Sequence, residues 1–233
     1  MTHNLDNLHA RLAAVDAAIA AAAARHQRPA AAVALLAVSK TQPAAAIRTV
    51  AAAGQRRFGE NYLQEALAKM AELSDLDLEW HFIGPLQSNK TRPVAEHFAW
   101  VHSVDRLKLA ERLSAQRPAA LPPLNVCLQV NISAEASKSG CSLAELPALA
   151  HAVAALPGLR LRGLMAIPAP AQGLEQQRQP FRQLRETLER LNAAGLHLDT
   201  LSMGMSDDLE AAIAEGATLV RVGSAIFGAR PAR

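Results

Sequence analysis

The sequence predicts a parallel (β/α)8 barrel (an α/β fold, the TIM barrel) with an extra helix at the N-terminus. Short apolar segments alternate with helical stretches along the chain, and strict alternation of this kind is typical of a parallel sheet. Eight strand–helix units follow one leading helix, and eight parallel strands joined by right-handed crossovers close a barrel. A doubly wound open sheet is the alternative. It usually has fewer strands, and no G-x-G-x-x-G sequence follows the first strand.

The leading helix is predicted over residues 4–26, because leucine, valine and isoleucine recur there at spacings of three and four. Pro29 ends this segment. The first strand follows over residues 33–38 as an uninterrupted apolar run, which is typical of a strand buried on both faces. Pro43 suits the first turn of the next helix, over residues 43–53, which stops at Gly54.

The other elements follow from the same patterns. Further strands are predicted over residues 56–58, 79–83, 98–103, 124–130, 159–165, 198–201 and 218–222. Three helix starts resemble capping boxes, and these pair Asn61 with Gln64, Ser142 with Glu145, and Asp207 with Glu210. The remaining helices are expected over 88–95, from 105 to before Pro118, around Phe181 and Leu191, and as a short turn at Gly223. No linker or shift in composition divides the chain, so residues 1–233 are expected to form one domain.

Composition excludes several classes of function. Half of the residues are apolar and the formal charge is only +3. No basic block is interleaved with aromatic residues, which disfavours nucleic acid as a partner. No apolar stretch is long enough to span a bilayer, and the N-terminus lacks the features of a signal peptide, so a cytoplasmic location is expected. The two cysteines, Cys127 and Cys141, favour a reducing compartment and argue against a disulfide framework or a zinc site.

Polar or unusual residues stand at nearly every predicted strand end, while the strand interiors are apolar. In a barrel the active site lies at the carboxyl ends of the strands, so these residues are expected to converge. They are Lys40, Asn61, His81, Ser103, Asn131, Lys138, Met165, Ser202, Met203, Arg221, Gly223 and Ser224.

The loops after the seventh and eighth strands predict an anion site. Gly223 and Ser224 stand between the last strand and a short helix, where backbone N–H groups and a hydroxyl can bind a phosphate. Ser202 and Gly204 come from the loop after strand seven, and barrels often hold phosphates between these two loops. A turn glycine and a serine that caps a helix remain the alternative interpretation.

Lys40 ends the first strand, and its amine is the candidate reactive group. Taken alone, it could be a strand-end lysine that reaches into water. A lysine opposite a phosphate site suits pyridoxal phosphate, whose aldehyde condenses with an amine. Arg221 could face the ring nitrogen, and a permanent cation there disfavours protonation of the ring. That arrangement disfavours transamination and decarboxylation.

Several strings, taken together and in order, resemble the pyridoxal phosphate homeostasis protein family, the single-domain relative of the alanine-racemase-type barrels. The resemblance extends from about residue 30 to residue 228. The strings are Ala37–Thr41, Phe58–Asn61, Trp80–Lys90, Val130–Ile132, Ser137–Gly140, Gly163–Met165, Leu201–Ser206 and Val220–Gly228.

The resemblance implies a fold type III barrel that binds pyridoxal 5'-phosphate, and it implies roles for individual residues. Lys40 matches the Schiff-base lysine, Asn61 a residue near the cofactor ring, and Arg221 the arginine that faces the ring nitrogen. The phosphate pocket corresponds to Ser202, Gly223 and Ser224. Lys138 matches a lysine in a loop near the cofactor.

This chain also departs from the family's pattern. Gln42 stands where many members have a second lysine, and the tail ends in the arginine-rich Arg230–Arg233. His81 and Lys90 belong to the longest of the matching strings, yet no chemistry is assigned to either.

Two functions follow from the resemblance. The first is a carrier that takes part in vitamin B6 homeostasis, in which the protein buffers the cofactor or delivers it to apoenzymes. The alternative is an amino-acid racemase, which needs a base on each face of the substrate α-carbon. Lys40 could supply one base, whereas Tyr62 and His81 are the only candidates for the other, so the carrier is favoured. A monomer is expected.

Overall fold

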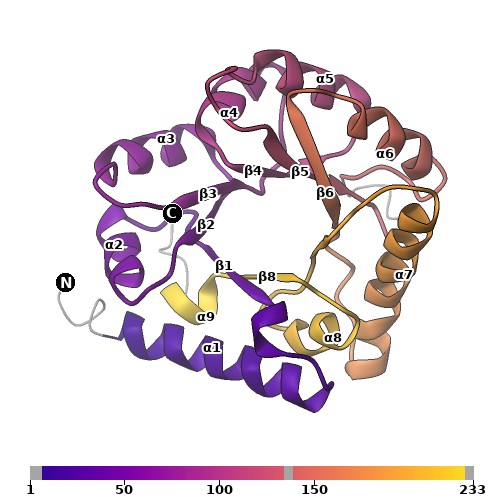
Figure 1. The fold of residues 1–233 in the computed structure, drawn as a ribbon. Helices are drawn as coiled ribbons and strands as arrows, with labels where there is room; N and C mark the ends of the chain where they lie inside the picture. Colours follow the sequence, from indigo (N-terminus) through magenta and orange to yellow (C-terminus); the bar gives the residue numbers. More distant parts are fainter. Residues whose placement is uncertain (1–6, 134–138, 229–233) are drawn as a thin grey trace.

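The strands close into one parallel barrel, as predicted. In the computed structural model, which describes residues 7–133 and 139–228, each strand pairs with its neighbour in sequence and β8 pairs with β1 (Figure 1). The strands are β1 Ala34–Val38, β2 Arg57–Glu60, β3 Glu79–Phe82, β4 Trp100–Val104, β5 Leu124–Gln129, β6 Leu159–Met165, β7 Thr200–Ser202 and β8 Leu219–Val222.

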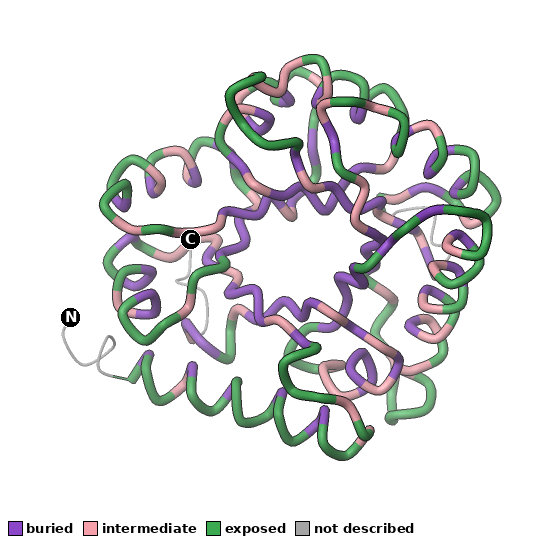
Figure 2. Tube along the Cα trace, in the orientation of Figure 1, coloured by how far each residue is buried: buried purple, intermediate pink, exposed green. Residues whose placement is uncertain are grey.

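Helices surround the barrel and bury one face each. They are α1 Leu8–Arg25, α2 Ala44–Ala52, α3 Leu63–Glu72, α4 Thr91–His97, α5 Leu107–Gln116, α6 Leu146–Ala154, α7 Leu174–Ala193, α8 Leu209–Ala214 and α9 Ser224–Phe227, with 3-10 turns η2 Ala30–Ala32 and η3 Ser88–Lys90. Figure 2 shows the buried inner ring and the exposed outer faces of the helices. No helix in the described part of the chain has the length and hydropathy needed to cross a bilayer.

The leading helix covers one side of the barrel. The predicted apolar stripe of α1 is buried at Leu8, Leu12, Val15 and Ile19. The helix contacts α2, α8 and α9 and so lies against the elements that flank β1 and β8 (Figure 1). It therefore covers the outer surface next to the strand that leads into Lys40.

One predicted capping box forms its hydrogen bonds and two do not, although α6 itself begins only after Glu145, with no side-chain cap. Ser142 and Glu145 bond reciprocally: the Ser142 N–H and hydroxyl donate to Oε2 of Glu145, and the Glu145 N–H donates to the Ser142 hydroxyl. At the other two positions the helix begins one or two residues later, after Tyr62 and Asp208, with no side-chain cap. Asn61 and Asp207 instead line a cavity, which is why neither side chain folds back onto its own helix.

The barrel interior is less apolar than the sequence suggests. The almost fully buried polar side chains of its strands include His81, His102, Ser202 and Arg221. Buried polar groups persist where they satisfy one another's hydrogen bonds, and these four are connected to one another, as described below.

Candidate functional site

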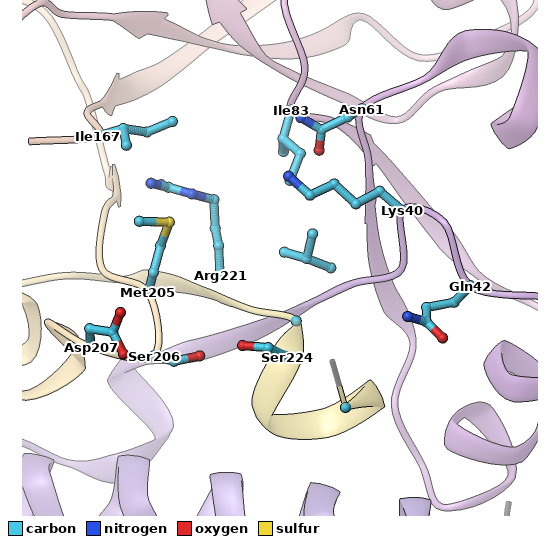
Figure 3. Close-up of a pocket in the computed structure, with 13 residues that line it drawn as sticks. Lys40, Gln42, Asn61, Ile83, Ile167, Met205, Ser206, Asp207, Arg221 and Ser224 are labelled. Carbon is cyan, nitrogen blue, oxygen red and sulfur yellow. The ribbon is translucent and has the colours of Figure 1, made fainter. Parts of the chain in front are cut away.

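A cavity of about 290 Å³ opens at the carboxyl ends of β1, β2 and β8 (Figure 3). Its position matches the expectation that polar strand-end residues converge there. Five of the six predicted site residues line it. The lining residues are Val38, Lys40, Gln42, Asn61, Ile83, Ile167, Met205, Ser206, Asp207, Arg221, Gly223, Ser224 and Gly228.

Lys40 stands two residues after the end of β1 and extends its side chain across the cavity toward Asn61 and Ile83 (Figure 3). The backbone around it is tightly held. The Ser39 N–H donates to the Gly59 carbonyl and the Gln42 N–H donates to the Ser39 carbonyl, both at 3.0 Å. Thr41 has a φ of 65°, a left-handed conformation that is costly for a residue branched at Cβ.

A buried ion cluster behind β1 holds this loop. The Lys69 ammonium donates to the Ser39 carbonyl and to Oε1 of Glu60, each at 2.8 Å, and it also pairs with Glu65. Glu65 in turn accepts a 2.5 Å hydrogen bond from the Thr41 N–H. Burial raises the pKa of Glu60, while the charge of Lys69 acts in the opposite direction. The cluster therefore ties both residues flanking Lys40 to α3.

Arg221 forms the floor of the cavity, and its side chain is almost fully buried. One guanidinium nitrogen, Nη1, donates to the carbonyl and the hydroxyl of Ser202, at 2.5 and 2.8 Å, and Nη2 donates to the Ala166 carbonyl at 2.9 Å. Burial lowers the pKa of Arg221 to about 10. The described residues form no ion pair with it within 4.0 Å, so its charge is balanced mainly by dipoles.

Ser202 was expected in a phosphate pocket, but the structure places it outside the cavity lining. Its side chain is fully buried beneath Arg221 and does not line the cavity. The reason is that β7 extends one residue beyond the predicted end, so Ser202 is the last strand residue and points into the barrel. Ser206, which the sequence analysis did not single out, lines the cavity instead.

Two hydroxyls and a carboxylate lie on the side of the cavity away from the tip of Lys40. Ser224 stands at the start of α9, and Ser206 faces it from the loop after β7 (Figure 3). Gly223 lies close to β1, because a Cβ there would come within 3.1 Å of the Val38 carbonyl oxygen. Asp207 lies beside Ser206 at the rim. A small anion would find hydroxyl donors from two loops here, and Arg221 lines the same cavity.

Asn61 presents an unused acceptor to the cavity. Its Oδ1 atom is buried and has no hydrogen-bond partner, and a buried polar atom left unpaired costs about 1–3 kcal/mol. Gly84 fixes its backbone, since a Cβ at Gly84 would lie 2.3 Å from the Asn61 carbonyl oxygen. A ligand with a donor group near Lys40 would satisfy this atom.

Other residues considered in the sequence analysis lie away from the cavity. Tyr62 is 47% exposed and His81 is buried inside the barrel, so neither lines the cavity. Lys90 is exposed in η3. Lys138 and the arginine-rich tail lie outside the described residues. Gln42 does line the cavity.

Acid is expected to weaken the fold through the two barrel histidines. Burial lowers the pKa of His81 and lowers the pKa of His102 well below its usual value. The unfolded chain therefore binds more protons below pH of about 6.5, and stability falls by about 1.4 kcal/mol per pH unit for each histidine down to its native pKa. Urea unfolding from pH 7.5 to 5.0 measures this slope.

The pH slope should be smaller in His102→Gln and unchanged in Cys127→Ala, since burial raises the pKa of the Cys127 thiol to about 12. Glu60 changes stability with pH in the opposite direction, because its raised pKa makes the native state bind protons more readily than the unfolded chain. Wild type and both variants retain Glu60, so its contribution cancels in the comparison. Equal slopes for wild type and His102→Gln would contradict the prediction.

Comparisons with known proteins identify relatives over most of the chain. The family model described as alanine racemase, N-terminal domain, matches residues 10–231. The pyridoxal phosphate homeostasis protein of Pseudomonas aeruginosa is 72% identical over 184 residues, which cover 79% of this chain and 79% of the relative. The protein of the same name from Escherichia coli K12 is 62% identical over 181 residues, covering 76% and 77%.

Solved structures agree with the barrel. PipY of Synechococcus elongatus, determined with PLP bound, superposes with a TM-score of 0.82 at 44% identity and covers 95% of this chain and 100% of its own. The alanine racemase of Corynebacterium glutamicum has a TM-score of 0.70 at 18% identity, covering 98% of this chain but 62% of the racemase. At that identity the racemase is a relative in fold alone.

Proposed function

The chain belongs to the pyridoxal phosphate homeostasis protein family, built on the barrel of the alanine racemase N-terminal domain, and on that premise we propose that it binds pyridoxal 5'-phosphate at Lys40 and holds the cofactor without turning over a substrate. The observation that carries the proposal is the cavity, which combines one lysine, one buried guanidinium and two facing hydroxyls.

The residues present fit this cofactor. When bound, pyridoxal phosphate supplies an aldehyde that condenses reversibly with a primary amine. Lys40 would supply the amine, and the orphaned Oδ1 of Asn61 would accept a hydrogen bond beside it. Ser206 and Ser224 would donate to the phosphate. These groups lie on different walls of one cavity, as a ligand with an aldehyde at one end and a phosphate at the other requires.

Arg221 would face the ring nitrogen. A guanidinium has five N–H donors and no acceptor, and contacts with Ser202 and Ala166 use three of them. The remaining donors are the Nε–H and one hydrogen of Nη2. A ring nitrogen opposite a donor-only group must accept, so the ring stays unprotonated. An unprotonated ring withdraws electrons weakly, which favours holding the cofactor over catalysis.

Among the described lining residues, no second base stands beside Lys40. Racemisation requires a base on each face of the α-carbon, yet Tyr62 and His81 lie elsewhere. Asp207, the remaining acidic group of the described lining, lies across the cavity from the Lys40 amine (Figure 3). We propose that the protein acts as a monomer. We also propose that it delivers pyridoxal phosphate to apoenzymes of the cytoplasm that depend on this cofactor.

The proposal is tested by reconstituting the purified protein with pyridoxal phosphate. A yellow protein that retains the cofactor through desalting, leaves L-alanine unracemised and activates a cofactor-free aminotransferase supports a carrier. Sustained conversion of an L-amino acid to its D-form would defeat the carrier function, and failure to bind the cofactor would defeat the whole proposal.

Replacing Ser224 by alanine is expected to weaken binding of pyridoxal phosphate by about tenfold or more, since one hydrogen bond to a charged group contributes about 1.5–3 kcal/mol. Binding of pyridoxal, which lacks the phosphate, should not change. Absorbance titration with both ligands measures the difference. An equal loss of affinity for the two ligands would mean that Ser224 does not bind the phosphate.

A further inference from the structure

A line of hydrogen bonds crosses the barrel interior from its amino mouth to the floor of the cavity. Oε1 of Glu79, the first residue of β3, lies 2.9 Å from Nε2 of His81. Nδ1 of His81 lies 2.9 Å from Nε2 of His102. Nδ1 of His102 lies 2.8 Å from the Ser202 hydroxyl, which accepts from Arg221 at 2.8 Å.

The chemistry of the first group fixes the direction of the whole line. An ionised carboxylate only accepts, so His81 must carry its proton on Nε2 and leave Nδ1 as an acceptor. His102 must then donate from Nε2, and its own Nδ1 must accept. The Ser202 hydroxyl therefore donates to His102 and turns a lone pair toward Arg221. His81, His102 and the Ser202 hydroxyl each then have one satisfied donor and one satisfied acceptor.

From this arrangement we propose that Glu79 sets the direction of a relay through His81, His102 and Ser202, which orients Arg221 toward the cavity at the opposite mouth of the barrel. These four are positioning residues, since none lines the cavity. The inference rests on the proposed function at one point, namely that Arg221 faces a bound cofactor.

The surroundings keep both histidines neutral. His81 stacks on Trp100 at 5.3 Å between ring centroids, and the guanidinium of Arg162 lies over the Trp100 ring, 4.8 Å from its centroid. The charged groups acting on the line are Glu79 and Arg57 near His81 and Arg221 near His102. Two of these three are cations, and they oppose a positive charge on either ring.

Protonation at one end would reverse the line. A proton gained at Nδ1 of His81 turns that atom into a donor, so His102 must move its own proton from Nε2 to Nδ1. Nδ1 of His102 would then donate to Ser202, whose hydroxyl proton would lose its acceptor. The titration of His81 and the tautomer of His102 are therefore coupled, and both should change at the same pH.

Nitrogen NMR of histidine in the cofactor-free protein tests the relay directly, because ring ¹⁵N shifts distinguish the two tautomers. At pH 7.5 both histidines should be neutral with the proton on Nε2. Glu79→Leu should produce a population of His102 with its proton on Nδ1. Arg57→Leu is the matched control: it removes the other partner of the same carboxylate, at 3.2 Å, and should leave both tautomers as in wild type.

The opposite tautomer in wild type, or wild-type tautomers in Glu79→Leu, would overturn the relay. Pyridoxal phosphate titration then measures its effect on the cavity: Ser202→Ala and Glu79→Leu should each weaken binding by about threefold or more, and Arg57→Leu by less than twofold. Unchanged affinity in both variants would overturn the orientation of Arg221 by the relay. A wild-type protein that binds no cofactor would refute the proposed function while leaving the NMR result readable.

Discussion

Replacing Lys40 by alanine is expected to abolish the visible absorption of the reconstituted protein and to weaken retention of pyridoxal phosphate by at least a hundredfold. The reason is that the bond between the aldehyde and the lysine amine is lost, while hydrogen bonds to the phosphate and ring remain. Difference spectroscopy and equilibrium dialysis measure the two effects. Stability should change little, because Lys40 projects into a cavity and is not packed in the core.

Lys90→Ala provides the matched control for this experiment. Lys90 belongs to the same set of family strings but is exposed in η3, away from the cavity. The variant should bind and absorb as wild type does. Retention of the visible band in Lys40→Ala, or its loss in Lys90→Ala, would contradict the assignment of Lys40.

The second large effect is expected from Lys69→Met, which should lower the free energy of unfolding by about 3–5 kcal/mol. Removing one partner of a buried ion pair leaves the other charge without compensation, and here Glu60 is fully buried with one carboxylate oxygen, Oε2, already unpartnered. The same change releases the Ser39 carbonyl and loosens the loop that carries Lys40. Urea unfolding and a cofactor titration follow the two consequences.

Lys108→Met on α5 removes an exposed lysine and should change stability by less than about 0.5 kcal/mol. Adding Glu60→Gln to Lys69→Met should restore part of the loss, because the uncompensated charge is then gone. A loss below about 1 kcal/mol in Lys69→Met would mean that the cluster does not hold this loop.

The fold was predictable because its signal repeats. Alternation of strands and helices does not depend on any single boundary, and eight repetitions leave little choice of topology. The predicted bounds of residues 159–165 coincide with β6, whose ends are marked by Gly158 and by Ile167–Pro168. Two capping boxes were wrong because the same polar residues face the cavity.

The site was predictable where strand ends mark it. Lys40, Asn61, Arg221 and Gly223–Ser224 were identified from their places at or just after strand ends, and all of them line one cavity. Ser202 was misplaced because a one-residue extension of a strand turns its last side chain into the barrel. Ser206 follows it in a loop, where no periodic pattern indicates which side chain faces inward.

The supporting residues could not have been found from the sequence. Lys69 was not singled out from the sequence, and Leu67 and Met70 of the same helix are only partly buried. The buried face follows Ala66 and Lys69 instead. His81 and His102 stand in strands 21 residues apart, and only the closed barrel brings their rings together.

The central claim is that pyridoxal phosphate is held covalently by one lysine at the mouth of the barrel. Borohydride reduction of the loaded protein, followed by proteolysis and mass spectrometry of the peptides, tests it most directly. The account predicts a single modified peptide that contains Lys40, at a stoichiometry of one cofactor per chain. Modification spread over several lysines, or confined to a peptide without Lys40, would contradict it.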